Sequence, residues 1–119
     1  MPSELSETDR RDLLERITAE RGRVAARAGQ LAAAFDAIAE TAALAPPDDE
    51  HDPEGATVGF ERAQTAALLD RARAQVAELD AAAERLRTGT YGTCSSCARP
   101  IGIARLHARP TATRCIACA

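Results

Sequence analysis

The sequence predicts a mainly α-helical protein, in which two long helices form an antiparallel coiled-coil hairpin with an acidic tip and a small four-cysteine head follows them. Three observations predict this fold. Apolar residues recur every three or four positions on both sides of a proline pair, the recurrence stops at a glycine at residue 89, and four cysteines come after it. We therefore divide the chain into a hairpin over residues 1–88, with its tip at about residues 46–55, and a head over residues 89–119.

The composition favours long helices over a globular core. The chain has 119 residues, which is room for one domain at most. Hydrophobic residues make up 45% of it, but 28 of them are alanine, and the chain has two Phe, one Tyr and no Trp. Because so few bulky side chains are present, the expected packing is that of helices joined along a narrow apolar seam.

The first helix begins with a capping signal. Ser6 is followed three residues later by Asp9, which is the spacing at which the two residues can cap a helix start. Gly22 and Gly29 each cost about 1 kcal/mol relative to alanine within a helix. We interpret them either as points of close helix approach or as tolerated defects. The predicted apolar stripe, which weakens at Arg21 and Ala28, consists of Leu14, Ile17, Val24, Leu31, Phe35 and Ile38.

A second helix starts a few residues after the first one ends. Pro46 and Pro47 end the first helix, because proline lacks the amide donor and clashes with the preceding turn. Asp52 is the expected N-cap of the second helix, with Pro53 at its first position, and Gly89 is the expected stop. Two helices joined by so short a connection fold back as an antiparallel hairpin. The second stripe consists of Leu69, Ala72, Val76, Leu79, Ala83 and Leu86.

The four cysteines predict a structural zinc site. Cys94 and Cys97 form one C-x-x-C pair, Cys115 and Cys118 form a second, and seventeen residues separate the pairs. This spacing is typical of four-cysteine zinc sites, and a closed shell of four sulfurs leaves no position for a substrate. Zinc binding contributes on the order of 10 kcal/mol, which a head without a large core needs in order to fold. His107 is a weaker alternative ligand, and a disulfide or redox pair is a weaker alternative use of the cysteines.

The charges are separated along the chain. Five of the seven residues from 48 to 54 are acids, whereas no acid follows Thr88. Arginines that compensate the charge of a zinc–thiolate cluster and arginines that bind nucleic acid remain two open interpretations of the basic head. The candidate contact residues are Arg99, Arg105, Arg109 and Arg114.

Several function classes are disfavoured. Residues 1–17 contain no apolar core of a signal peptide, and no run approaches the roughly 20 apolar residues of a membrane span, so we expect a cytoplasmic protein without membrane contact. An enzyme is not expected either, because the metal shell is closed and no nucleophile–base pair or phosphate-cradling loop is visible.

The head resembles a known zinc finger. The runs YGTCSSC, residues 91–97, and PIGIARLHARPTATRCIAC, residues 100–118, resemble the zinc finger of the DksA/TraR family of bacterial transcription factors. The resemblance implies a regulator that binds RNA polymerase and inserts its coiled coil into the secondary channel, while the zinc head stays against the channel rim. It also implies that acids at the hairpin tip approach the catalytic centre, and that sequence-specific DNA binding is not expected.

The resemblance also singles out acids within the tip. Family tips carry the pattern D-x-x-D, which the run DEHD matches with Asp49 and Asp52. Asp52 with Glu54 is the rival pair. Glu50, which lies between Asp49 and Asp52, also belongs to the predicted tip. Members that respond to the alarmone ppGpp use basic residues around the head and the base of the second helix. Here that base mixes acids with arginines and only Ala119 follows the last cysteine, so ppGpp is a weaker candidate partner than RNA polymerase.

A second function class stays open beside this one. The chain could be a zinc-headed adaptor that binds a protein or a nucleic acid through the four arginines of its head. Binding to nucleic acid would weaken steeply with salt and would not need the acids of the tip.

Overall fold

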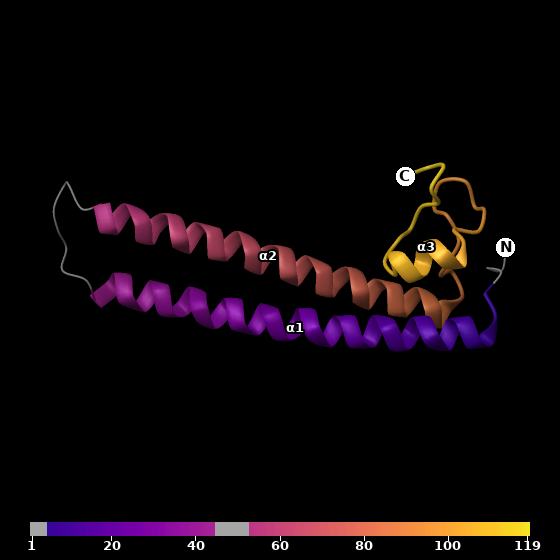
Figure 1. Cartoon of the computed structure of the whole chain (residues 1–119), viewed down its shortest axis with the longest axis horizontal. Helices are drawn as coiled ribbons and strands as arrows, with labels where there is room; N and C mark the ends of the chain where they lie inside the picture. The colour runs from indigo at the N-terminus through magenta and orange to yellow at the C-terminus, as the bar shows by residue number, and fades with distance from the viewer. Residues whose placement is uncertain (1–4, 45–52) are drawn as a thin grey trace. The chain divides into compact units, whose positions relative to one another are not determined.

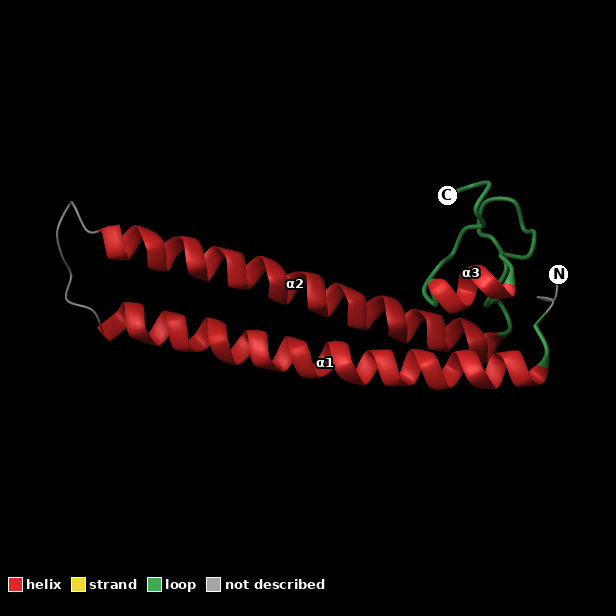
Figure 2. Cartoon of the chain, viewed as in Figure 1, coloured by secondary structure: helices red, strands yellow, loops and turns green. Residues whose placement is uncertain are grey.

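The computed structural model describes residues 5–44 and 53–119 (Figure 1). It contains three helices in this part of the chain: α1 (Glu7–Leu44), α2 (Pro53–Thr88) and α3 (Ile103–Ala108). The two long helices pack antiparallel, and the only pairing of extended backbone in the described ranges is an isolated bridge between Thr93 and Pro100 (Figure 2). The predicted mainly helical hairpin with a four-cysteine head is therefore confirmed.

The start of α1 is capped as predicted. The N–H of Asp9 donates to the Ser6 hydroxyl at 3.0 Å, and the N–H of Ser6 donates back to the Asp9 carboxylate at 3.1 Å. These two bonds satisfy donors that a helix start otherwise leaves unpaired. Glu7 and Asp9 also place negative charge in the first turn, where the helix dipole favours it.

Both ends of α2 follow from the sequence. The helix begins at Pro53 and ends at Thr88, while its predicted N-cap, Asp52, lies outside the described residues. Gly89 adopts φ +86°, a conformation that favours glycine, and its N–H donates to the Arg85 carbonyl at 2.9 Å. The glycine stop is therefore confirmed.

The described chain divides into two compact units. One comprises Met1–Arg23 and Gln75–Ala119, and the other comprises Val24–Ala74. The first unit contains the start of α1, the end of α2 and the whole head, and the second contains the remaining turns of both long helices. The predicted domain boundary between residues 88 and 89 stays a prediction.

The apolar seam of the first unit differs from the predicted stripe at one position. Leu13 is fully buried and Ile17 is 1% exposed, whereas Leu14, which we placed in the stripe, is 44% exposed. Successive helical residues point about 100° apart, so only one of two neighbouring leucines can face the seam. Leu13 lies four residues before Ile17 and Leu14 lies three, and both spacings fit a coiled coil. Packing therefore selects Leu13.

Polar residues flank this seam. Arg21, which interrupts the stripe, forms an exposed ion pair with Asp80 of α2. Arg10 donates from Nη2 to the Leu86 carbonyl at 2.6 Å, which pairs one of the last carbonyl groups of α2. The first turns of α1 and the last turns of α2 are thus connected by side chains as well as by the apolar seam.

Among the described residues, fewer are buried in the second unit than in the first. Val24, Leu69 and Ala72 are buried in the second unit, and the guanidinium of Arg62 lies 5.1 Å from the centre of the Phe35 ring, within cation–π range. A Cβ atom added to either glycine of α1, Gly22 of the first unit or Gly29 of the second, would meet no described atom within 4 Å beyond its chain neighbours and the nearby backbone of α1 itself. The interpretation of these glycines as close-approach points is therefore wrong, and the structure leaves them as tolerated defects.

Candidate metal centre and basic pocket

The first cysteine pair lies in a tight turn. The N–H of Cys94 donates to the Arg99 carbonyl, and the N–H of Ile101 donates to the Gly92 carbonyl, both at 2.8 Å. Ala98 follows the second cysteine of the pair and adopts φ 63°, a left-handed conformation uncommon for alanine. This backbone bends sharply enough for both sulfurs of the pair to join one cluster.

The segment that leads to the second pair is bonded to the start of the head. The Tyr91 hydroxyl donates to the Pro110 carbonyl at 2.8 Å, and the N–H of Ser95 donates to the Thr113 carbonyl at 2.8 Å. Tyr91 is fully buried, as is Leu106 of α3. Burial raises the pKa of the Tyr91 hydroxyl to about 12. These contacts close the loop between the two cysteine pairs.

The four sulfurs form one cluster whose dimensions fit zinc. All four Sγ atoms lie within 4.8 Å of one another, and those of Cys97 and Cys115 are 3.7 Å apart. Zinc binds thiolates at about 2.3 Å, so two ligands of a regular tetrahedron stand about 3.8 Å apart. Each cysteine is free of a disulfide. The predicted ligands, Cys94, Cys97, Cys115 and Cys118, are therefore brought together, and His107 is not a member of the cluster.

The protonation of the cluster also favours a cation. Hydrogen bonds from the backbone N–H groups of Cys115 and Cys97 lower the pKa of the Cys94 thiol to about 6. The pKa of Cys118 is raised to about 12, because its thiol hydrogen-bonds the neighbouring sulfurs, first that of Cys115. Four thiolates this close repel one another, so they do not all ionise without a cation. A divalent cation balances the charge of the thiolates and displaces the remaining protons. The donor set and its geometry fit a structural Zn²⁺ ion.

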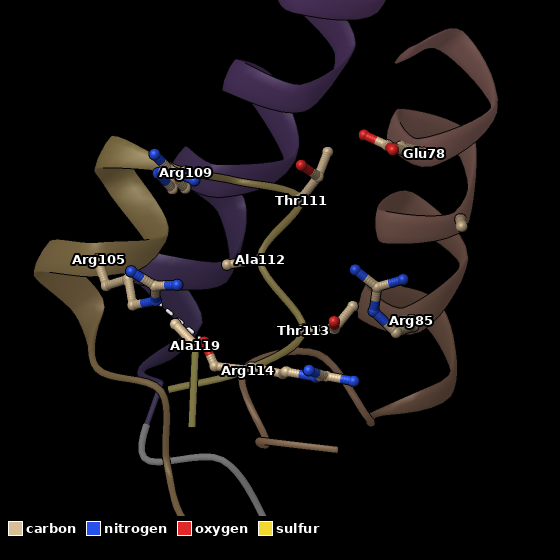
Figure 3. Close-up of a pocket in the computed structure, with 10 residues that line it drawn as sticks. Glu78, Arg85, Arg105, Arg109, Thr111, Ala112, Thr113, Arg114 and Ala119 are labelled. Atoms are coloured by element: carbon tan, nitrogen blue, oxygen red, sulfur yellow. Dashed lines mark hydrogen bonds between the residues drawn. The ribbon is translucent and has the colours of Figure 1, made fainter. Parts of the chain in front are cut away.

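A basic pocket lies beside the α2 side of the head. Figure 3 shows side chains from α2, from α3 and from the segment after α3 around it (Figure 3). Its volume is about 540 Å³, and three of the predicted contact residues line it: Arg105, Arg109 and Arg114. Arg99 is not among the lining residues. The sequence thus identified most of the cationic residues of this pocket without indicating that they share it.

Two residues of α2 complete the basic pocket. Arg85 was not among the predicted contact residues, and its Nη2 atom is buried without a hydrogen-bond partner in the described part of the chain. The sequence places Arg85 about one turn before the end of α2, next to the head, and this position could have identified it as a contact residue. Glu78 is the one carboxylate side chain among the residues that line the pocket. Among its side chains, the pocket therefore carries four guanidinium groups against one carboxylate.

The structure describes one of the four predicted tip acids. Asp49, Glu50 and Asp52 lie outside the described residues, between the last residue of α1 and the first of α2. Glu54 belongs to the first turn of α2. Their assignment as a functional tip stays a prediction.

Comparison with known proteins decides what the head is. The pattern of the prokaryotic dksA/traR C4-type zinc finger matches residues 89–119. This segment is a DksA/TraR zinc finger. The finger contains all four clustered cysteines, so the expectation of a structural zinc ion is confirmed, and so is the resemblance on which the family assignment of the head was based.

Relatives with the same finger are named as transcription factors. RNA polymerase-binding transcription factor DksA of Caulobacter vibrioides is 45% identical over 53 residues, which cover 44% of this chain and 37% of the relative. The protein of the same name in Escherichia coli is 41% identical over 49 residues, which cover 41% and 32%. The match thus spans only about a third of these relatives. Their names describe transcription factors and not enzymes, in agreement with the expected non-enzymatic role.

The structural likeness extends beyond the DksA/TraR finger. The transcription factor DksA2 from Pseudomonas aeruginosa superimposes with a TM-score of 0.81 at 28% identity, over 95% of this chain and 81% of that one. The likeness therefore includes the long helices as well as the head. In the parts of the chain that the structure describes, no helix is long and apolar enough to cross a bilayer.

Proposed function

We propose that this protein is a transcription regulator that binds RNA polymerase and inserts its acidic hairpin tip into the secondary channel. One observation carries the proposal: the fold of a DksA-type transcription factor extends over 95% of the chain, including both long helices. The relatives that share the zinc finger are named for binding RNA polymerase. A common finger on a common fold supports a common partner.

The charge distribution supports the mechanism. Residues 48–54 contain five acids, and they lie where the chain passes from α1 to α2. Clustered like charges repel one another and destabilise the folded chain. Such a cluster is therefore expected where its electrostatic field acts on a partner. In the proposal, Asp49 and Asp52 approach the catalytic centre of the polymerase, Glu50 and Glu54 add to the field, and the head stays at the channel rim.

The head supplies a rigid base for this arrangement. Zinc held by Cys94, Cys97, Cys115 and Cys118 fixes the finger, and the finger belongs to the same compact unit as the first turns of α1 and the last turns of α2. The metal acts as a structural element, because four sulfur ligands leave no open coordination position.

An in vitro transcription assay with purified RNA polymerase tests the proposal. The protein is expected to change transcription, and Asp49→Asn with Asp52→Asn is expected to abolish this effect while polymerase binding is retained. Asp36→Asn with Asp70→Asn is the matched control, because it removes two charges from exposed positions on α1 and α2 outside the tip. Asp52→Asn with Glu54→Gln tests the rival pair. Full activity of both tip variants would contradict the tip mechanism.

One observation favours a second candidate function. Arg85, Arg105, Arg109 and Arg114 line a single pocket, which suits an adaptor that binds an acidic protein or a nucleic acid through its head. Binding that falls steeply with salt and is unchanged by the tip substitutions would favour this role. ppGpp remains a weaker candidate ligand, and repeating the transcription assay with and without ppGpp tests it.

A further inference from the structure

A second groove on the zinc finger is apolar. It has a volume of about 610 Å³ and is lined by Ile103, Ala104 and Ala108 of α3 and by Ile116 of the second cysteine pair, among others. Ile116 is 82% exposed and Ile103 is 38% exposed. Large apolar side chains that are exposed to solvent in one groove indicate a surface that binds a partner.

The backbone around the groove is held in place. Ile116 lies between Cys115 and Cys118, two members of the sulfur cluster, and the N–H of Cys118 donates to the Cys115 carbonyl at 3.1 Å. Ile103 opens α3, whose backbone is anchored at Leu106, a fully buried residue. A partner would therefore meet a preformed surface, and little conformational entropy would be lost in ordering it.

The charge along the groove indicates the chemistry of the partner. Arg105 and Arg109 also line it, and neither forms an ion pair with any residue that the structure describes. The Arg105 Nε donates to the Arg114 carbonyl at 2.9 Å, which orients the guanidinium and leaves its other N–H groups for a partner. No acid occurs after Thr88. The groove thus joins an apolar floor to a cationic edge whose two guanidinium groups form no ion pair in the described residues.

We propose that the face defined by Ile103, Arg105, Arg109 and Ile116 docks a protein segment of RNA polymerase in which apolar residues are flanked by Asp or Glu. The polymerase as the source of this segment rests on the proposed function. The apolar residues fill the groove, and the acids pair with the two guanidinium groups.

Other occupants fit the same face less well. A second copy of this chain, bound through the same face, would bring the arginines of both copies together without any acid to compensate them. A nucleic acid would satisfy the arginines through its phosphates, but its charged backbone offers nothing to the two isoleucines. A protein segment with both apolar and acidic side chains can fill the groove and also pair with the two arginines.

A binding experiment with two matched variants tests the docking face. Ile116→Asp places a carboxylate in the groove, whereas Ala117→Asp places one on the neighbouring exposed residue, which does not line the groove. The equilibrium Kd of each zinc-loaded protein for purified RNA polymerase is measured, together with its zinc content. Ile116→Asp is expected to raise the Kd about tenfold or more, as for a central interface residue, and Ala117→Asp about twofold or less. Ile103→Asp repeats the test on α3, away from the cysteines.

The possible results separate this inference from the proposed function. If the unmodified protein binds polymerase and both isoleucine variants bind equally well, the docking face is wrong and the proposed function stands. If the unmodified protein does not bind polymerase, both fall. Equal losses in Ile116→Asp and Ala117→Asp would also overturn the docking face, because a general charge effect would explain them. Binding to a DNA or RNA fragment that both isoleucine variants abolish, with polymerase binding unchanged, would assign the face to nucleic acid instead.

Discussion

The buried hydroxyl of Tyr91 gives a direct test of how the head is held together. Tyr91→Phe keeps the fully buried ring but removes the 2.8 Å hydrogen bond to the Pro110 carbonyl. Losing such a bond and leaving its acceptor unpaired costs about 1–2 kcal/mol. We therefore expect the free energy of unfolding of the zinc-loaded protein to fall by about this amount near neutral pH, measured by urea denaturation followed by circular dichroism.

The same hydroxyl predicts how stability changes with pH. Its pKa in the folded protein is raised to about 12, above the value of about 10 expected in the unfolded chain. The folded state therefore holds this proton more tightly, and the stabilisation is complete below about pH 10 and is lost as pH rises through about 12. The unmodified protein loses this contribution at alkaline pH and Tyr91→Phe does not, so the stability difference between them should shrink there.

The chain provides its own probe for this prediction. Tyr91 is the single tyrosine of the sequence and there is no tryptophan, so the tyrosinate absorbance reports this residue alone. A titration midpoint near 10 in the folded, zinc-loaded protein, or a Tyr91→Phe variant as stable as the unmodified protein, would refute the reasoning.

Three further predictions follow from the packing and from the metal. Leu13→Ala should lower the free energy of unfolding by about 2–5 kcal/mol, and Leu14→Ala by well under half of that, since only Leu13 is fully buried; similar losses in both would contradict the assigned seam. Ser6→Ala removes the hydroxyl that caps α1 and should cost about 1 kcal/mol, read by thermal unfolding; an unchanged Tm would show that the cap is not needed. Removing zinc with a chelator should unfold the head and expose four thiols to a thiol reagent, while addition of zinc should restore protection; thiols that react equally before and after chelation would exclude a metal-clamped cluster.

Much of the local structure could be predicted because it depends on neighbouring residues. The cap at Ser6, the start of α2 at Pro53 and its stop at Gly89 each depend on residues a few positions apart. The four-cysteine cluster could be predicted for the same reason, since each C-x-x-C pair already places two ligands close together.

The remaining features depend on contacts between distant parts of the chain. Leu13 and Leu14 fit the helical repeat equally well, and only packing against α2 separates them. The bond from Tyr91 to Pro110 spans nineteen residues, so no local pattern announces it. Arg85 belongs to the basic pocket because the head folds beside the end of α2.

Crosslinking to RNA polymerase tests the central claim most directly. A photoreactive amino acid at position 52, within the acidic segment, is activated in the complex of the zinc-loaded protein with purified polymerase, and the crosslinked polymerase peptides are identified. The proposed function predicts crosslinks to segments that surround the catalytic centre. Crosslinks confined to the outer surface of the polymerase, in a complex that forms normally, would contradict it.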